Sequence, residues 1–319
     1  MNRPRLVLAV LALIALGWGL GGWVLPGPLK KDTEFSLAGG TSVAGAAEAL
    51  EAKGAVTSAL AFRIRARLLG GSEPIKAGLF ILPKGASQRT LLGILQSGKV
   101  VRRFVTVPEG MPSVMVQERL MAQPGLTGAI TVPAEGALLP DTYEVGAGES
   151  RQAVVARMEA AMQRTLADLW AKRAADTVAQ TPRQALILAS IVEKETGKPS
   201  ERAMVAGLYS NRLRRGMRLQ ADPTIIYPVT RGKPLGRRIR QSEIAERNGY
   251  NTYAMAGLPE GPITNPGRAS IEAVLHPAKT DALYMVADGT GGHVFAASLE
   301  EHNRNVAKWF AIRRARGEL

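Results

Sequence analysis

Two glutamates, Glu193 and Glu195, stand near the end of an apolar stretch, residues 181–197. The stretch opens with threonine and proline, which favour the first positions of a helix, and it closes with a glycine, which favours the end of one. The sequence therefore predicts a helix whose last turn carries both carboxyl groups. A carboxyl group among apolar side chains loses the water around its charged form, so its pKa rises towards the range that a general acid needs. Sugar-cleaving enzymes give this property to one carboxyl group.

The helical period distinguishes the two glutamates. At about 100° per residue, Glu195 falls on the same stripe as Leu188 and Val192, whereas Glu193 lies roughly 160° away. We therefore expect Glu195, rather than Glu193, to be the acid. The alternative is a solvent-exposed carboxyl group at a frayed helix end, because an acidic residue in the last turn opposes the helix dipole.

Polar residues alternate in the segment that follows, residues 217–230, which is predicted to be mostly loop and short strand. Gln220, Asp222 and Thr224 carry groups that can hydrogen-bond sugar hydroxyls or orient Glu195. An aspartate before proline also forms ordinary turns, so a purely structural role is the alternative for this segment.

A second polar segment combines aromatic rings with an amide. Tyr250 and Asn251 lie in a Tyr-Asn-Thr-Tyr sequence. Aromatic faces stack on sugar rings, and an amide pairs with N-acetyl groups. Both residues are therefore candidates for contacting a glycan.

Other chemistries find less support. The three histidines, His276, His293 and His302, have no paired ligand at helical or hairpin spacing, so no metal site is predicted. Ser190 and Lys194 do not have the Ser-x-x-Lys spacing of a serine nucleophile with a lysine base. The sequence also has no P-loop or dinucleotide-binding fingerprint, and no cofactor is predicted.

Composition limits the compartment and the partner. The 319 residues include no cysteine, which excludes disulfides and thiolate chemistry. The formal charge of +14, from 41 Lys and Arg against 27 Asp and Glu, indicates a polyanionic partner. Nucleic acid, acidic lipids and cell-wall glycan all have that character, and no zinc-finger or RNP-like signature points to nucleic acid.

The beginning of the chain predicts a membrane anchor. Residues 6–25 form an uncharged run of 20, about the length that a helix needs to cross a bilayer. Arg3 and Arg5 favour a cytoplasmic N-terminus for residues 1–5, although Lys30 and Lys31 on the far side weaken the bias. The rest of the chain is then expected outside the inner membrane, which argues against nucleic acid as the partner.

The remaining sequence predicts two domains with mixed helices and strands, residues 30–104 and residues 105–319. Apolar periodicity, caps and turn residues indicate where the elements lie. The expected helices are 41–53, 58–69, 90–97, 150–174, 181–197, 201–215, 269–275 and 298–314, and the expected strands are 78–82, 105–107, 283–287 and 293–297.

Several motifs together resemble those of the YceG-like family of membrane-anchored endolytic murein transglycosylases. The motifs occur in one order and are residues 189–196 (ASIVEKET), 211–213 (NRL), 216–224 (GMRLQADPT), 250–253 (YNTY) and 276–280 (HPAKT). The resemblance implies an α+β fold with one N-terminal transmembrane helix, a small LysM-like α/β domain at 30–104, and a mixed catalytic domain at 105–319 with a lysozyme-like helical active-site region.

The resemblance also implies a reaction and its residues. It implies cleavage of the β-1,4 bond between N-acetylmuramic acid and N-acetylglucosamine within nascent peptidoglycan strands, without water, leaving 1,6-anhydro ends and ending strand growth. Glu195 would be the acid and base, since Glu195-Thr196 resembles the Glu-Ser pair of lysozyme-like lytic transglycosylases. The implied substrate-binding residues are Glu193, Gln220, Asp222, Thr224, Tyr250 and Asn251.

Partners and location follow from the same resemblance. It implies a single-pass inner-membrane protein with a periplasmic catalytic domain that acts on peptidoglycan strands beside peptidoglycan polymerases or penicillin-binding proteins. The alternative hypothesis is a membrane-tethered scaffold that binds peptidoglycan without cutting it.

Overall fold

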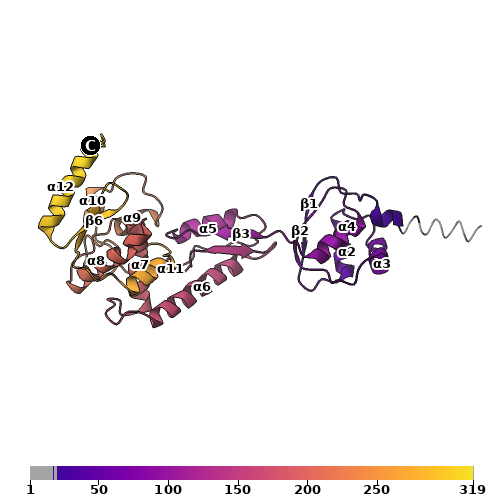
Figure 1. Cartoon of the computed structure of the whole chain (residues 1–319), viewed down its shortest axis with the longest axis horizontal. Helices are drawn as coiled ribbons and strands as arrows, with labels where there is room; N and C mark the ends of the chain where they lie inside the picture. The colour runs from indigo at the N-terminus through magenta and orange to yellow at the C-terminus, as the bar shows by residue number, and fades with distance from the viewer. Residues whose placement is uncertain (1–16, 18–19, 319) are drawn as a thin grey trace, which may run out of the picture. The chain divides into compact units, whose positions relative to one another are not determined.

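The computed structural model describes residue 17 and residues 20–318. It divides into two compact units, one of Met1–Phe104 with Glu144–Gly148 and the other of Val105–Tyr143 with Glu149–Leu319. Within the described residues, helices predominate and the strands form three two-stranded sheets (Figure 1). The fold is therefore α+β, which confirms the predicted class.

The first unit packs three helices around an antiparallel strand pair. Phe35 of the first strand lies opposite Phe80 of the second, and both side chains are buried with Phe62 from the second helix. Serine side chains cap each of the three helices. The elements are β1 (Thr33–Leu37), α2 (Val43–Ala52), α3 (Ala59–Leu69), β2 (Gly78–Leu82) and α4 (Gln88–Ser97).

The predicted transmembrane segment, residues 6–25, lies mostly outside the described residues. Its last part, residues 20–24, is helical, and Trp23 is buried in the core of the first unit. Among the residues that the structure describes, no helix combines the length and the apolar character needed to cross a membrane.

The second unit is built around one buried helix, α7 (Pro182–Glu195), which includes the predicted active-site stretch. Its neighbours in the core are α6 (Arg151–Ala171), α8 (Arg202–Arg214), α9 (Pro223–Thr230) and α11 (Arg268–Leu275). The buried residues of α7 lie on all its faces, because neighbours surround it (Figure 1). The unit also contains α5 (Ser113–Ala122), the 3₁₀ turn η1 (Pro199–Glu201) and α10 (Gln241–Ala245).

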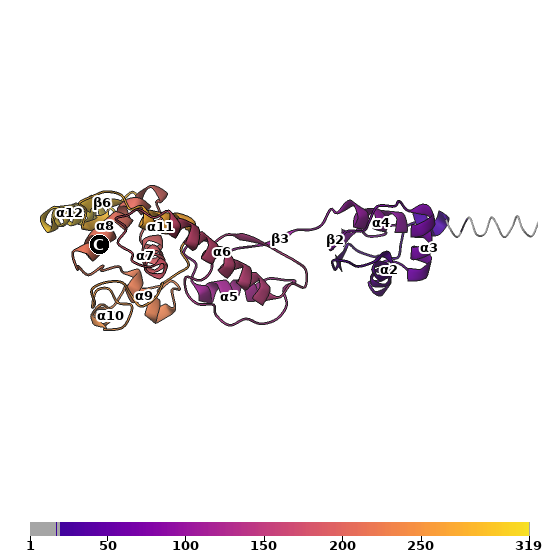
Figure 2. The same ribbon diagram turned by 90° about the horizontal axis from the view of Figure 1, so that it is seen from below.

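Two further strand pairs complete the fold. β3 (Arg103–Thr106) pairs with β4 (Thr142–Val145), and β5 (Tyr284–Ala287) pairs antiparallel with β6 (His293–Ala296). The last helix, α12 (Leu299–Ala315), packs against β5 and β6 (Figure 2). The register of the hairpin places His293 opposite Ala287 at its turn.

One predicted segment has a different structure. Residues 217–230, expected as loop and short strand, include the helix α9. Pro223 occupies its first turn, where a missing N–H costs nothing, and Ile225 is buried against the core. Burial of its apolar side outweighs the strand preference of its β-branched residues, which is the physical reason that the prediction was wrong here.

Candidate active site

The end of α7 presents Glu195 to a pocket. Thr181 caps the helix by accepting a hydrogen bond from the Gln184 backbone N–H at 3.2 Å, and Pro182 follows at the first helical position. The helix ends at Glu195, since the next residue, Thr196, has an extended backbone. The sequence therefore fixes Glu195 in the last turn of a well-anchored helix.

The pocket beside Glu195 has a volume of about 250 Å³. Five separate segments of the second unit form its wall: the end of α7, one face of α8, the loop before α9, the loop after α10, and the β5–β6 hairpin. The lining residues are Glu195, Leu208, Tyr209, Arg212, Leu219, Gln220, Asp222, Tyr253, Met285, Val286, Ala287 and His293.

The environment of Glu195 favours its neutral form. Burial, followed by the negative charge of Asp222, raises the pKa of Glu195 to about 7. A hydrogen bond from Tyr209 and the positive charge of Arg212 act in the opposite direction. Its Oε1 atom is buried and has no hydrogen-bond partner among the described residues. A protonated carboxyl group in this position has a free oxygen with which to serve an incoming substrate.

This raised pKa predicts a pH-dependent stability. Between pH 4.5 and about 7 the folded chain keeps the proton on Glu195 while the unfolded chain has released it. The free energy of unfolding should therefore fall by about 3 kcal/mol as pH rises through this window. Urea unfolding of the wild type and of Glu195→Gln at pH 4.5, 6 and 8 measures the difference between the two proteins. A difference that does not change with pH would contradict the raised pKa.

Arg212 organises the floor of the pocket. The Arg212 guanidinium donates to the carbonyl oxygens of Leu283 at 2.6 Å and Leu219 at 2.8 Å, and to Gln220 Oε1 at 3.3 Å. These bonds join α8 to the hairpin and to the loop before α9. Gln220 has a left-handed backbone with φ of 53°, a conformation that costs a non-glycine residue energy and that surrounding contacts must maintain.

Asp222 forms a pair with an aromatic residue across the pocket. The Tyr253 hydroxyl donates to Asp222 Oδ1 at 2.6 Å. Burial raises the pKa of Tyr253, and the hydrogen bond to Asp222 raises it further, so the phenol remains a donor. Of the predicted substrate-binding residues, Gln220 and Asp222 thus line the pocket of Glu195.

Thr224 and Asn251 lie behind the pocket wall and have no exposed surface. The Thr224 hydroxyl bonds the Ala221 carbonyl and lies 2.8 Å from the Thr252 hydroxyl. The Asn251 side-chain amide donates to three backbone carbonyls after Arg240, of which Glu246 is the nearest at 2.6 Å. Both side chains hold the loops in place.

Tyr250 lies apart from the pocket of Glu195. Its ring packs against Tyr227 of α9 with centroids 4.8 Å apart. The Arg183 guanidinium and the Glu260 carbonyl, which are 3.0 Å apart, belong to the same neighbourhood. Tyr250 therefore faces another part of the second unit than Asp222 does.

The Glu193 carboxyl group is paired with other groups of the protein. Its side chain is 5% exposed, lies 3.6 Å from the Arg202 guanidinium and accepts a hydrogen bond from the Gly267 backbone N–H at 2.9 Å. Arg202 also binds Glu109 at 2.8 Å. These contacts connect α7 to α8 and to the segment before α11, which is a structural role.

The structure adds pocket residues that sequence reasoning did not select, namely Tyr209, Arg212, Tyr253 and His293. Tyr209 and Arg212 are three residues apart on α8, so they share one face of the helix. That spacing is the sequence signal that could have placed Tyr209 and Arg212 together at one site. His293 comes from a distant hairpin and has no local signal. Among the described residues, no three metal-ligating side chains gather into a metal site.

The chain is similar in sequence and structure to a family of known proteins. The YceG-like family matches residues 35–308. A Bacillus subtilis protein named endolytic murein transglycosylase is 27% identical, over 94% of this chain and 92% of that protein. A Streptococcus pneumoniae protein of the same name is 29% identical over 88% of this chain, which spans 58% of the pneumococcal protein. A crystal structure of a yceG-like protein from Listeria monocytogenes is 27% identical, with a TM-score of 0.55, over 86% of this chain and 99% of that one.

Proposed function

Because the chain belongs to the YceG-like family, we propose that it is an endolytic murein transglycosylase with Glu195 as its acid and base. The observation that carries the assignment of Glu195 is its buried Oε1 atom, which lacks a partner and borders a polar pocket. A carboxyl group with a pKa of about 7 can give and take a proton near neutral pH.

The proposed reaction needs one carboxyl group. Glu195 donates its proton to the glycosidic oxygen, the bond from C1 of N-acetylmuramic acid to that oxygen breaks, and N-acetylglucosamine leaves as an alcohol. The C6 hydroxyl of the same muramic acid then attacks C1 and gives its proton to Glu195. The product is a 1,6-anhydro end, the carboxyl group regains its proton, and no water is consumed.

Asp222 places a second carboxylate in the pocket of Glu195, so hydrolysis is the alternative reaction to consider. Glycosidases that use water employ two carboxyl groups, of which one activates the water or attacks C1. In the proposed reaction Asp222 instead raises the pKa of Glu195 and accepts the Tyr253 hydrogen bond. Within the second unit, Gln220 and Asp222 are the proposed sugar contacts in this pocket, and Tyr250 is proposed for a more distant sugar.

The products distinguish these reactions. We expect the protein, incubated with uncrosslinked peptidoglycan strands in H₂¹⁸O, to release fragments with 1,6-anhydro ends that contain no ¹⁸O. Mass spectrometry of the fragments measures both properties. Reducing ends labelled with ¹⁸O would show hydrolysis, and binding to the strands without cleavage would show a scaffold.

The first unit is proposed as a LysM-like glycan-binding domain. A groove of about 820 Å³ runs between α2, α3 and α4, and Arg63 and Arg67 line it together with Gln96. Basic and amide side chains suit a glycan that bears carboxylates and N-acetyl groups. The family resemblance and this groove together support the proposal.

Anchoring and partners belong to the same proposal. The uncharged run at residues 6–25 supports a single-pass inner-membrane protein with a cytoplasmic N-terminus and a periplasmic catalytic unit. Such a tether places the enzyme on nascent strands near the membrane. Peptidoglycan polymerases and penicillin-binding proteins are the partners expected there.

A further inference from the structure

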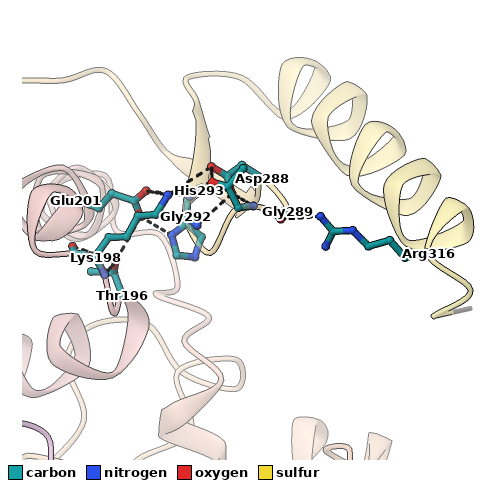
Figure 3. A network of polar contacts seen from close by, with 9 residues as sticks. Thr196, Lys198, Glu201, Asp288, Gly289, Gly292, His293 and Arg316 are labelled. Atoms are coloured by element: carbon teal, nitrogen blue, oxygen red, sulfur yellow. Dashed lines mark hydrogen bonds and ion pairs between the residues drawn. The ribbon is translucent and has the colours of Figure 1, made fainter.

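His293 contributes an imidazole to the pocket of Glu195 from a distant part of the chain. It is the first residue of β6, its side chain is 20% exposed, and it lines the same pocket as Glu195 and Asp222. Figure 3 shows its ring between Glu201 and the turn of the hairpin. The reaction proposed above gives this ring no role.

Glu201 holds His293 at two points. Glu201 Oε2 lies 2.8 Å from His293 Nδ1, and Oε1 accepts the His293 backbone N–H at 3.0 Å (Figure 3). Burial alone raises the pKa of Glu201, but the hydrogen bonds from His293 and Thr196 outweigh it, and the pKa lies below its ordinary value. Glu201 is therefore a carboxylate, which only accepts hydrogen bonds.

This carboxylate determines which ring nitrogen of a neutral His293 carries the proton. Because Glu201 only accepts, Nδ1 is the donor, and the lone pair lies on Nε2. No described residue hydrogen-bonds Nε2. The ring therefore has an acceptor without a protein partner while it lines a pocket whose other members are mostly polar.

The same carboxylate is also connected to the catalytic end of α7. Thr196, the residue after Glu195, donates from its hydroxyl to Glu201 Oε2 at 3.3 Å. Lys198 also reaches the hairpin: its Nζ lies 3.1 Å from the Thr290 hydroxyl. The same Nζ lies 3.8 Å from Asp288 Oδ2 in the hairpin turn (Figure 3). Glu201 thus fixes the hairpin relative to the helix end that carries the acid.

We propose that His293 is a second functional residue of this site, whose Nε2 accepts a hydrogen bond from a hydroxyl or N-acetyl N–H of the sugar bound at Glu195, and that Glu201 is the positioning residue that orients it. The inference rests on the proposed function, because it names the contact that the glycan makes on the hairpin side of the pocket. A ring that served only to fasten the hairpin would need its Nδ1 bond alone.

Two substitutions of His293 separate the two edges of the ring. His293→Asn keeps a donor near Nδ1 for Glu201 but has no atom in the place of Nε2, whereas His293→Gln places an amide near Nε2. We expect kcat/KM for strand cleavage to fall at least about tenfold in His293→Asn and clearly less in His293→Gln, with the thermal midpoint little changed. His276→Asn, which alters an exposed histidine bonded to the Lys172 carbonyl, is the control and should match the wild type.

The role of Glu201 has a spectroscopic test. ¹⁵N NMR of histidine-labelled protein should show the Nδ1-protonated tautomer for His293 in the wild type and a loss of that preference in Glu201→Gln, together with reduced kcat/KM. If His293→Asn cleaves strands like the wild type, or if the Asn variant outperforms the Gln variant, the contact through Nε2 is refuted.

A binding measurement keeps this inference separate from the proposed reaction. In a Glu195→Gln background, which lacks the acid, calorimetry with a peptidoglycan oligosaccharide should show a Kd about tenfold weaker after His293→Asn. This result together with a wild type that makes no anhydro ends would overturn the reaction and leave the His293 contact standing. Equal Kd values would overturn the His293 contact even if cleavage is observed.

Discussion

Glu195→Gln is expected to reduce the release of 1,6-anhydro ends by about 10²- to 10⁴-fold, towards the upper end of that range. The reason is that one group supplies both proton transfers: an amide neither protonates the leaving oxygen nor accepts the C6 proton. The shape of the side chain is retained, and the buried Oε1 atom has no hydrogen bond to lose among the described residues. Chromatography of muropeptides from treated strands measures the loss.

The comparison for this variant is Glu193→Gln, two residues earlier on α7. It weakens the ion pair with Arg202 but leaves the pocket of Glu195 intact, so the expected result is lower stability and a much smaller loss of product. If Glu193→Gln were the inactive variant and Glu195→Gln the active one, the acid would be assigned to the wrong glutamate.

Arg212→Met is expected to damage both stability and the pH profile. The change leaves the buried carbonyls of Leu219 and Leu283 without their donor, which should lower the free energy of unfolding by about 2–4 kcal/mol. It also removes a positive charge that lowers the pKa of Glu195. The pKa of Glu195 should then rise, and the alkaline limb of activity should move to higher pH.

Urea unfolding and a pH–rate profile measure the two effects of Arg212→Met. Arg215→Met provides the control, because Arg215 is the C-cap residue of the same helix, α8, but its side chain is exposed. Its stability should stay within about 0.5 kcal/mol of the wild type. Equal losses in the two variants would mean that Arg212 acts through general charge rather than through its bonds to the pocket loops.

The predictability of this fold depends on how local each signal is. The helix around Leu188 follows from a threonine cap, a proline and apolar periodicity, all within a few residues of sequence. The hairpin at 284–296 follows likewise from its glycine-rich turn. By contrast, the helix after Asp222 forms because its apolar side meets α7, and such tertiary burial has no signature within the segment itself.

The candidate site was harder to predict from local sequence than the helices were. The apolar stripe led to the preference for Glu195, but α7 is surrounded on all sides and Glu193 is also buried. What separates the two carboxyl groups is the balance of nearby charges. Glu193 forms an ion pair with Arg202, whereas at Glu195 the effect of the negative Asp222 exceeds that of the positive Arg212. These contacts come from segments that are distant in the chain, so the helical period alone does not reveal them.

The distribution of the pocket wall along the chain has a consequence for timing during synthesis. The proposed acid, Glu195, lies on α7, while Met285 and His293 close the pocket from a hairpin near the C-terminus. A polypeptide that is still emerging from the ribosome therefore carries its acid well before it carries the opposite wall. If the proposed site is the active site, the nascent chain completes it late in synthesis, and we expect fragments that end before the hairpin not to cleave peptidoglycan.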